Sequence, residues 1–119
     1  MIIIGTNLIS CKAKQTKYES DYIELISKEL GGEREVSVTN GRIDILTDEI
    51  AYEVEWARKW KHSIGQAIWY GLQSDRTPGI ILILQDKSDY KYVLQLESAL
   101  LHSELNKEIV IRIYPNDFQ

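Results

Sequence analysis

The spacing of apolar residues predicts a helix and three short strands in the first half of the chain. Residues 18–30 carry apolar side chains at positions 22, 23, 26 and 30, the repeat of an amphipathic helix, and two glycines then end it. Strand-like runs follow at 35–39, 42–46 and 50–55, with turn-forming residues at Asn40-Gly41 and at 47–49. The alternation across residues 41–56 is too regular for a loop.

The second half of the chain predicts two more helices and two more strands. A helix of about 16 residues ends near residue 71 and carries an apolar stripe, which consists of Trp60, Ile64, Ala67, Ile68 and Gly71. Residues 79–84, GIILIL, are apolar on both faces, as in a central strand covered on both sides. A helix at 88–105 and a strand at 109–114 complete the order α-β-β-β-α-β-α-β. This order predicts an α/β fold in which helices pack against a mixed sheet.

The length and composition fit a single domain over residues 1–119. Hydrophobic residues make up 44% and charged residues 27%, as in a soluble globular protein. No apolar run approaches the roughly 18 to 20 residues of a membrane span. The opening residues 1–10 lack a basic region and predict a strand, not a signal peptide, so we expect a cytoplasmic protein without a membrane segment. The lone Cys11 excludes an internal disulfide and a thiolate zinc cluster.

The distribution of charge is more informative than its sum. The formal net charge of -4 argues against a general nucleic-acid coat, because phosphate binding uses a local surplus of Lys and Arg. A solvated face is the usual meaning of a charge run. Two basic clusters nevertheless stand out, one formed by Lys12, Lys14 and Lys17 and the other by Arg58, Lys59 and Lys61.

The hairpin at 42–55 places two acids opposite each other. If Asp48 and Glu49 form a two-residue turn, paired positions add to 97, so Asp44 lies opposite Glu53. A four-residue loop keeps this register and a three-residue loop destroys it. Like charges in directly opposed positions are destabilising unless something compensates them. A divalent cation with oxygen ligands, Mg²⁺ or Mn²⁺, would do so.

A bland alternative exists for the same hairpin. Its other face carries Ile43, Ile45, Tyr52 and Val54, which predicts a core face and leaves the acids on a polar outer face. In the same register Glu55 lies opposite Arg42, so it could simply form a cross-strand ion pair.

Further polar residues converge on the acidic face. At 100° per residue, Lys59, Gln66 and Tyr70 fall within about 40° of one another on the following helix, with His62 close by. In the first helix, Glu19 projects along the line of the apolar residues and points toward the edge of the sheet. Its alternative role is that of an acid favoured by the helix dipole in the first turn.

These residues resemble the PD-(D/E)xK nuclease superfamily, especially its small members that are like Holliday-junction resolvases or RecB. The resemblance covers most of the chain, and the residues that carry it are Glu19, Asp44 within GRID, Glu53-Val54-Glu55 in place of E-x-K, and the Gln-x-x-x-Tyr from Gln66 to Tyr70. It implies a restriction-endonuclease-like fold and metal-dependent hydrolysis of DNA phosphodiester bonds. The departure is Glu55, which stands where the family usually has Lys.

The resemblance also implies roles for individual residues. Asp44, Glu53 and the carbonyl of Val54 would hold Mg²⁺ or Mn²⁺. Lys59 would replace the missing family lysine, and Glu55 would act as base or extra ligand. Glu19 could hold a second metal or a metal-bound water. The residues expected to orient or contact DNA are Gln66, Tyr70, Arg58 and Lys61.

Other functions remain open at this point. The main alternative is a catalytically degenerate nuclease-fold module that binds nucleic acid or a protein partner, and the last is an ordinary structural α/β subunit. A homodimer with two sites is expected, with Trp56 or Trp69 as exposed interface residues. Trp69 could equally stack on a base. The substrate could be a four-way junction, a flap, a free end, a plain duplex or RNA.

Overall fold

The computed structural model describes residues 17–118 and confirms the predicted order of elements. The expected strand at 1–10 and the basic residues Lys12 and Lys14 lie outside the described residues. Within 17–118, no helix is long and apolar enough to cross a membrane. The elements are α2 (Glu19–Leu30), β1 (Glu33–Val38), β2 (Gly41–Leu46), β3 (Ile50–Trp56), the 3₁₀ segment η1 (Ala57–His62), α3 (Ser63–Ser74), β4 (Thr77–Ile83), the short 3₁₀ turn η2 (Lys87–Asp89), α4 (Tyr90–His102) and β5 (Val110–Tyr114).

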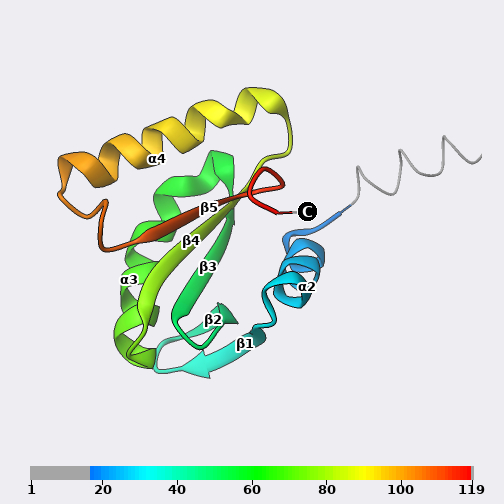
Figure 1. Cartoon of the computed structure of the whole chain (residues 1–119), viewed down its shortest axis with the longest axis vertical. Coiled ribbons are helices and arrows are strands. Elements are labelled where there is room, and N and C mark those ends of the chain that lie inside the picture. Colours follow the sequence, from blue (N-terminus) through cyan, green and yellow to red (C-terminus); the bar gives the residue numbers. More distant parts are fainter. Residues whose placement is uncertain (1–16, 119) are drawn as a thin grey trace, which may run out of the picture.

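The five strands form one mixed sheet in the order β1-β2-β3-β4-β5. The first two pairings are antiparallel and the last two are parallel. Helix α2 lies on one side of the sheet, and α3 and α4 lie on the other (Figure 1). The apolar strand β4 is covered on both sides, as its sequence predicts, because Ile80 to Ile83 have no exposed surface.

Two hydrophobic clusters hold these layers together. Under α2, Ile23 and Ile26 pack on Tyr52, Val54 and Ile81. On the other side α3 and α4 share a cluster whose buried members include Ala67, Ile80, Leu82, Val93, Leu96 and Leu100. The predicted core face of the hairpin is buried throughout, although Ile43 joins a third cluster with Ala51 and Tyr70.

The prediction of one continuous helix after β3 is wrong. Residues 57–62 form a 3₁₀ segment, and Lys59 has non-helical backbone angles of φ -108 and ψ 24. Ser63 stabilises the change of geometry, because its hydroxyl and its N–H both donate to the carbonyl of Trp60. The expected apolar stripe fails at Ile68, which is 43% exposed.

The two hairpin turns follow the predicted chemistry with one shift. The β1–β2 turn consists of Thr39 and Asn40, because Val38 pairs with Gly41, and Asn40 adopts a left-handed φ of 58, which Asn accepts more readily than most residues. Trp69 on α3 donates its indole N–H to the carbonyl of Thr39 at 2.7 Å. Both Trp56 and Trp69 are half-buried, so the expectation that they are exposed interface residues is wrong. The homodimer itself stays a prediction.

Strand β1 contains an irregular residue opposite Asp44. Glu35 has a positive φ of 54, which is unfavourable for a residue with a side chain. The pairing with β2 holds its register on both sides, at Arg34 with Ile45 and at Val36 with Ile43, but is interrupted at Glu35. The backbone of β2 is therefore unpaired with β1 at the position of Asp44.

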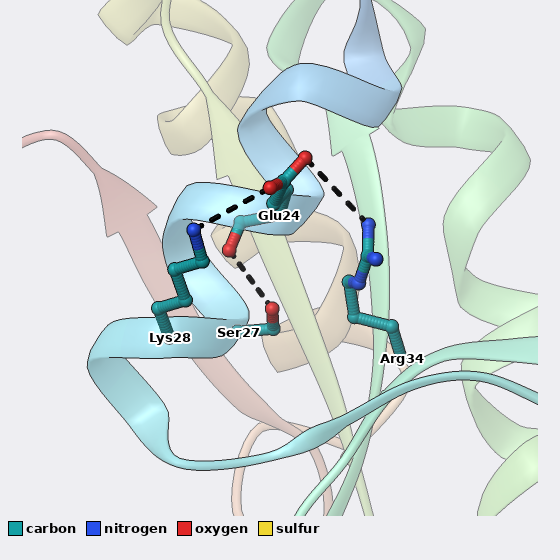
Figure 2. Close-up of polar contacts among 4 residues, drawn as sticks. All are labelled: Glu24, Ser27, Lys28 and Arg34. Carbon is teal, nitrogen blue, oxygen red and sulfur yellow. Dashed lines mark hydrogen bonds and ion pairs between the residues drawn. The ribbon is translucent and has the colours of Figure 1, made fainter.

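Charged contacts fasten α2 to strand β1 (Figure 2). Glu24 forms ion pairs with Lys28 on its own helix at 3.4 Å and with Arg34 on β1 at 3.9 Å. Ser27, which is buried, donates its hydroxyl to the carbonyl of Glu24 at 2.9 Å. Such exposed ion pairs each contribute less than about 1 kcal/mol, so they orient the helix more than they stabilise it.

Gly41 allows Tyr70 of α3 to lie directly against the start of β2. A Cβ atom at this position would come within 2.8 Å of the tyrosine ring and 2.9 Å of its hydroxyl. Real Cβ atoms do not approach other atoms so closely, and Tyr70 is itself buried. The glycine of the GRID motif therefore serves the packing of α3 on β2.

We predict that Gly41→Ala lowers the free energy of unfolding by about 1 to 3 kcal/mol, because the tyrosine ring must move. Gly65→Ala on α3 is the matched control. A Cβ there meets nothing within 4 Å, so this substitution should raise stability by about 0.5 to 1 kcal/mol through helix propensity. Urea unfolding followed by circular dichroism measures both. Equal effects of the two substitutions would contradict the packing role of Gly41.

Candidate functional site

The site is built where β2 separates from β3. The predicted two-residue turn at Asp48 and Glu49 is confirmed by the Thr47 N–H, which donates to the Ile50 carbonyl at 2.9 Å. The strands then pair in the predicted register, Leu46 with Ala51 and Ile45 with Tyr52, and the ladder stops there.

Beyond the last ladder pair, a side chain of β2, not its backbone, accepts a hydrogen bond from β3. The carboxylate of Asp44 accepts the Val54 N–H at 2.8 Å. This bond satisfies a backbone donor that would otherwise lose its partner as the strands part. It also holds the Asp44 carboxylate against β3, so the opposed arrangement of Asp44 and Glu53 survives although the backbone pairing has ended.

The carboxyl groups of Asp44 and Glu53 lie together, and their mutual influence favours a state in which the pair retains one proton. Glu53 is only 5% exposed. The pKa of Glu53 is raised to about 10, most of all by burial, then by the charge and contact of Asp44, and then by the charges of Glu55 and Glu19. Burial also raises the pKa of Asp44, although the Val54 N–H opposes this shift.

A second pair of acids adjoins the first. Glu19, in the first turn of α2, lies against Glu55 of β3. The pKa of Glu19 is raised to about 8. The largest cause is burial, the next are the contact with Glu55 and its charge, and the charge of Asp44 comes after them. The structure thus brings together four carboxyl groups from three elements. We call Glu19, Asp44, Glu53 and Glu55 the acid cluster.

The predicted ion pair of Glu55 with Arg42 is wrong. Arg42 Nη1 instead lies 3.7 Å from Glu35 on the neighbouring strand, and Glu55 accepts the backbone N–H of Trp56 at 2.9 Å. The physical reason is the divergence of β2 from β3, which carries Arg42 away from the end of β3 where Glu55 lies.

Lys59 belongs to a different element from the one predicted by the sequence analysis. The shared helical stripe with Gln66 and Tyr70 is wrong, because Lys59 belongs to η1 and those two residues belong to α3. The charge of its ammonium group nevertheless lowers the pKa of Glu19 and so opposes part of the shift caused by burial and the other acids. Lys59 is exposed and free to extend toward a ligand.

Gln66 and Tyr70 border the cluster from α3. The Tyr70 hydroxyl donates to Gln66 Oε1 at 3.2 Å, and Gln66 Nε2 donates to the carbonyl of His62 at 3.1 Å. Burial raises the pKa of Tyr70, and the charges of Glu53 and Asp44 contribute to the shift. These two residues therefore form a hydrogen-bonded wall beside the acids.

The other predicted substrate-binding residues lie on either side of Lys59 in η1. Arg58 donates its Nε to Gln85 Oε1 at 3.1 Å, just beyond the end of β4. The ammonium group of Lys61 lies over the Trp60 ring, 5.9 Å from its centroid. Both residues are exposed.

The donor set suits a magnesium ion better than a metal that needs a closed cage. Among residues 17–118, no group of three His, Cys, Asp or Glu side chains is arranged to hold a metal ion. Mg²⁺ is commonly bound by one or two carboxylates and several waters, which is what Asp44 and Glu53 can offer. One Asp44 oxygen remains after Oδ2 has accepted the Val54 N–H.

Comparison with known proteins gives two partial similarities. Segments of the chain match two proteins of Acanthamoeba polyphaga mimivirus that are named KilA-N domain-containing proteins, L32 and L33. The match with L32 is 39% identical over 46 residues, which are 39% of this chain and 12% of L32. The match with L33 is 37% identical over 54 residues, which are 45% of this chain and 22% of L33. The chain therefore spans less than a quarter of either relative. No protein-family profile and no solved structure matches it.

We predict that the stability of the metal-free protein falls as the pH rises from 6 to 10. Glu19 and Glu53 have folded-state pKa values of about 8 and about 10, above the ordinary value of 4.5. Their protonated forms therefore favour folding fully below about pH 4.5, and this contribution is lost as the pH rises through 8 to 10. Urea unfolding in EDTA at several pH values measures the effect. Glu53→Gln should flatten the curve, whereas Glu97→Gln on the exposed face of α4 should leave it unchanged. A wild-type curve that stays level or rises would contradict the prediction.

Proposed function

We propose that the chain acts on DNA and that its acid cluster binds Mg²⁺ and hydrolyses a phosphodiester bond, in the manner of a small PD-(D/E)xK nuclease. The observation that carries the proposal is the contact of Asp44 with Glu53 at the fork between β2 and β3, with Glu19 and Glu55 beside them. Four acids gathered in a partly buried place cost stability, and such costs are typical of functional sites.

A bound divalent cation would supply Lewis-acid polarisation of the phosphate and a more acidic attacking water. The residues of this chain would do the rest. Asp44 and Glu53 would lose their shared proton and present oxygen ligands from two strands. Glu55 would accept a proton from the water, and Lys59 would place its charge beside the phosphate as negative charge develops.

The wall formed by Gln66 and Tyr70 has a positioning role in this proposal. Tyr70 is buried and fixed against Gly41, so its hydroxyl holds the exposed Gln66 amide at the rim of the cluster. Gln66 keeps a side-chain N–H hydrogen beyond its bond to the His62 carbonyl, and that hydrogen could orient a phosphate oxygen.

A second candidate function is DNA binding without cleavage. The partial similarity to KilA-N domain-containing proteins favours a DNA-binding module over a nuclease. Glu55 in place of the family lysine also agrees with lost activity. In this alternative the acid cluster would be a remnant, and it would have no reason to retain a saturable site for a metal ion.

We predict that the wild-type chain cleaves DNA in Mg²⁺ or Mn²⁺ and that Glu53→Gln or Asp44→Asn lowers the rate by about 100-fold or more. The assay uses a labelled panel of single strand, duplex, flap and four-way junction, with EDTA as the metal-free arm. Glu97→Gln controls for the loss of one surface acid.

Circular dichroism of each variant verifies folding. Calorimetric titration with Mn²⁺ should show a saturable site that disappears in Glu53→Gln. DNA binding without cutting and without that site would overturn catalysis and establish the binding module.

Lys59 and Lys61 allow a matched test of the catalytic lysine. Both are exposed residues of η1, but Lys59 acts on Glu19 whereas Lys61 lies over Trp60. We predict that Lys59→Ala lowers the cleavage rate by about 100-fold while Mn²⁺ affinity changes little, because the lysine contacts the phosphate and not the metal. Lys61→Ala should change the rate by less than about threefold, as expected for a screened surface charge. Similar cleavage rates for the two variants would show that Lys59 has no catalytic role and is an ordinary surface charge.

A further inference from the structure

A row of four aromatic side chains lies across one end of the sheet. Tyr22 of α2 contacts Trp56 at the end of β3 with ring centroids 5.6 Å apart, and Tyr114 at the end of β5 with centroids 5.5 Å apart. Phe118 continues the series, 5.6 Å from Tyr114. All four residues are half-buried and pack against the hydrophobic cluster under α2. We call these four residues the aromatic row.

The aromatic row begins at the acid cluster. Trp56 directly follows Glu55 and donates its backbone N–H to that carboxylate at 2.9 Å. Tyr22 lies one helical turn after Glu19 on α2. Trp56 and Tyr114 flank Ile83 at the carboxyl ends of three parallel strands, and the C-terminal end of the described chain returns to the side of α2 (Figure 1). The row therefore leads away from the acids along one edge of the sheet.

Two cations lie on the aromatic row in a chain whose net charge is -4. The ammonium group of Lys17 is 5.3 Å from the centroid of the Tyr22 ring. The guanidinium carbon of Arg112 is 4.5 Å from the centroid of the Phe118 ring, and Arg112 Nη2 donates to the carbonyl of Asp117 at 3.1 Å. Next to Lys17, Tyr18 is 72% exposed.

Partly exposed rings that alternate with Lys and Arg are the chemistry that binds single-stranded nucleic acid. Bases of an unpaired strand can stack on such rings, whereas the bases of a duplex are already stacked inside the helix. We propose that the aromatic row holds a single strand of DNA beside the acid cluster, with Lys17 and Arg112 against its phosphates. The inference rests on the proposed function for the choice of DNA, and it assigns a single-stranded segment as the substrate.

The chain offers a matched control for the test. On α4, Lys91 lies 5.2 Å from the centroid of the Tyr92 ring, the same arrangement as Lys17 over Tyr22 but on a helix that covers the other side of the sheet. Tyr92 is also half-buried against a hydrophobic cluster. The variants to compare are Lys17→Ala, Tyr22→Leu and the double variant, against Lys91→Ala, Tyr92→Leu and their double variant.

The experiment measures binding of the full chain to labelled oligothymidylate and to a duplex of equal length, in EDTA so that cleavage cannot interfere. We expect tighter binding of the single strand, weakened about five- to hundredfold by Lys17→Ala/Tyr22→Leu and less than twofold by the α4 pair. The exposed Lys17→Ala alone should reduce the salt dependence of binding without affecting folding.

Equal losses in the two pairs, or no measurable single-strand binding by the wild type, would overturn the inference. Metal-dependent cleavage is scored separately in Mg²⁺. If the chain cleaves DNA but Lys17 and Tyr22 contribute nothing to binding, the proposed function is supported and the role of the aromatic row is contradicted. Row-dependent binding without cleavage would support the inference and remove the catalytic proposal.

Discussion

The hydrogen bond from the Val54 N–H to the Asp44 carboxylate is the contact on which the candidate site depends. A sheet normally continues its ladder until a strand ends, but here β2 leaves β3 while both strands still run on. The Asp44 side chain bridges the gap that opens. Without it, the Val54 N–H would lose its partner in a partly buried place, which costs about 1 to 3 kcal/mol. The same bond therefore supports the fold and keeps an acid next to Glu53.

Electrostatics and packing oppose each other at this fork. The neighbouring tyrosine, the close approach allowed by Gly41 and the cover of α2 all exclude water, and exclusion of water disfavours charged carboxyl groups. The cluster can reduce its repulsion by retaining protons or by binding a cation. Lys59 offsets part of the charge on Glu19. The arrangement is thus less stable with its carboxyl groups ionised than with them protonated.

Local sequence patterns were sufficient for the order of the elements but not for the fork between β2 and β3. The two-residue turn and the alternation of β2 and β3 determine the register, so the meeting of Asp44 with Glu53 could be predicted from local rules. Those rules assume that pairing continues, and for this reason they wrongly joined Arg42 to Glu55. The route of Lys59 to the cluster could not be predicted either, because the 3₁₀ geometry of η1 depends on how the chain passes from the sheet to α3. A prediction that assumes an ideal α-helix, with 100° between successive residues, takes no account of such a tertiary constraint.

The left-handed conformation of Glu35 also affects the outer edge of strand β1. Strand β1 is an outer strand of the sheet, and outer strands present unpaired N–H and C=O groups on which a strand of another molecule can add. A left-handed residue in the middle of a six-residue strand breaks the even spacing of those N–H and C=O groups. Growth of the sheet by edge-to-edge addition is therefore discouraged at β1. The irregular residue opposite Asp44 thus also makes this edge a poorer template for a strand of another molecule.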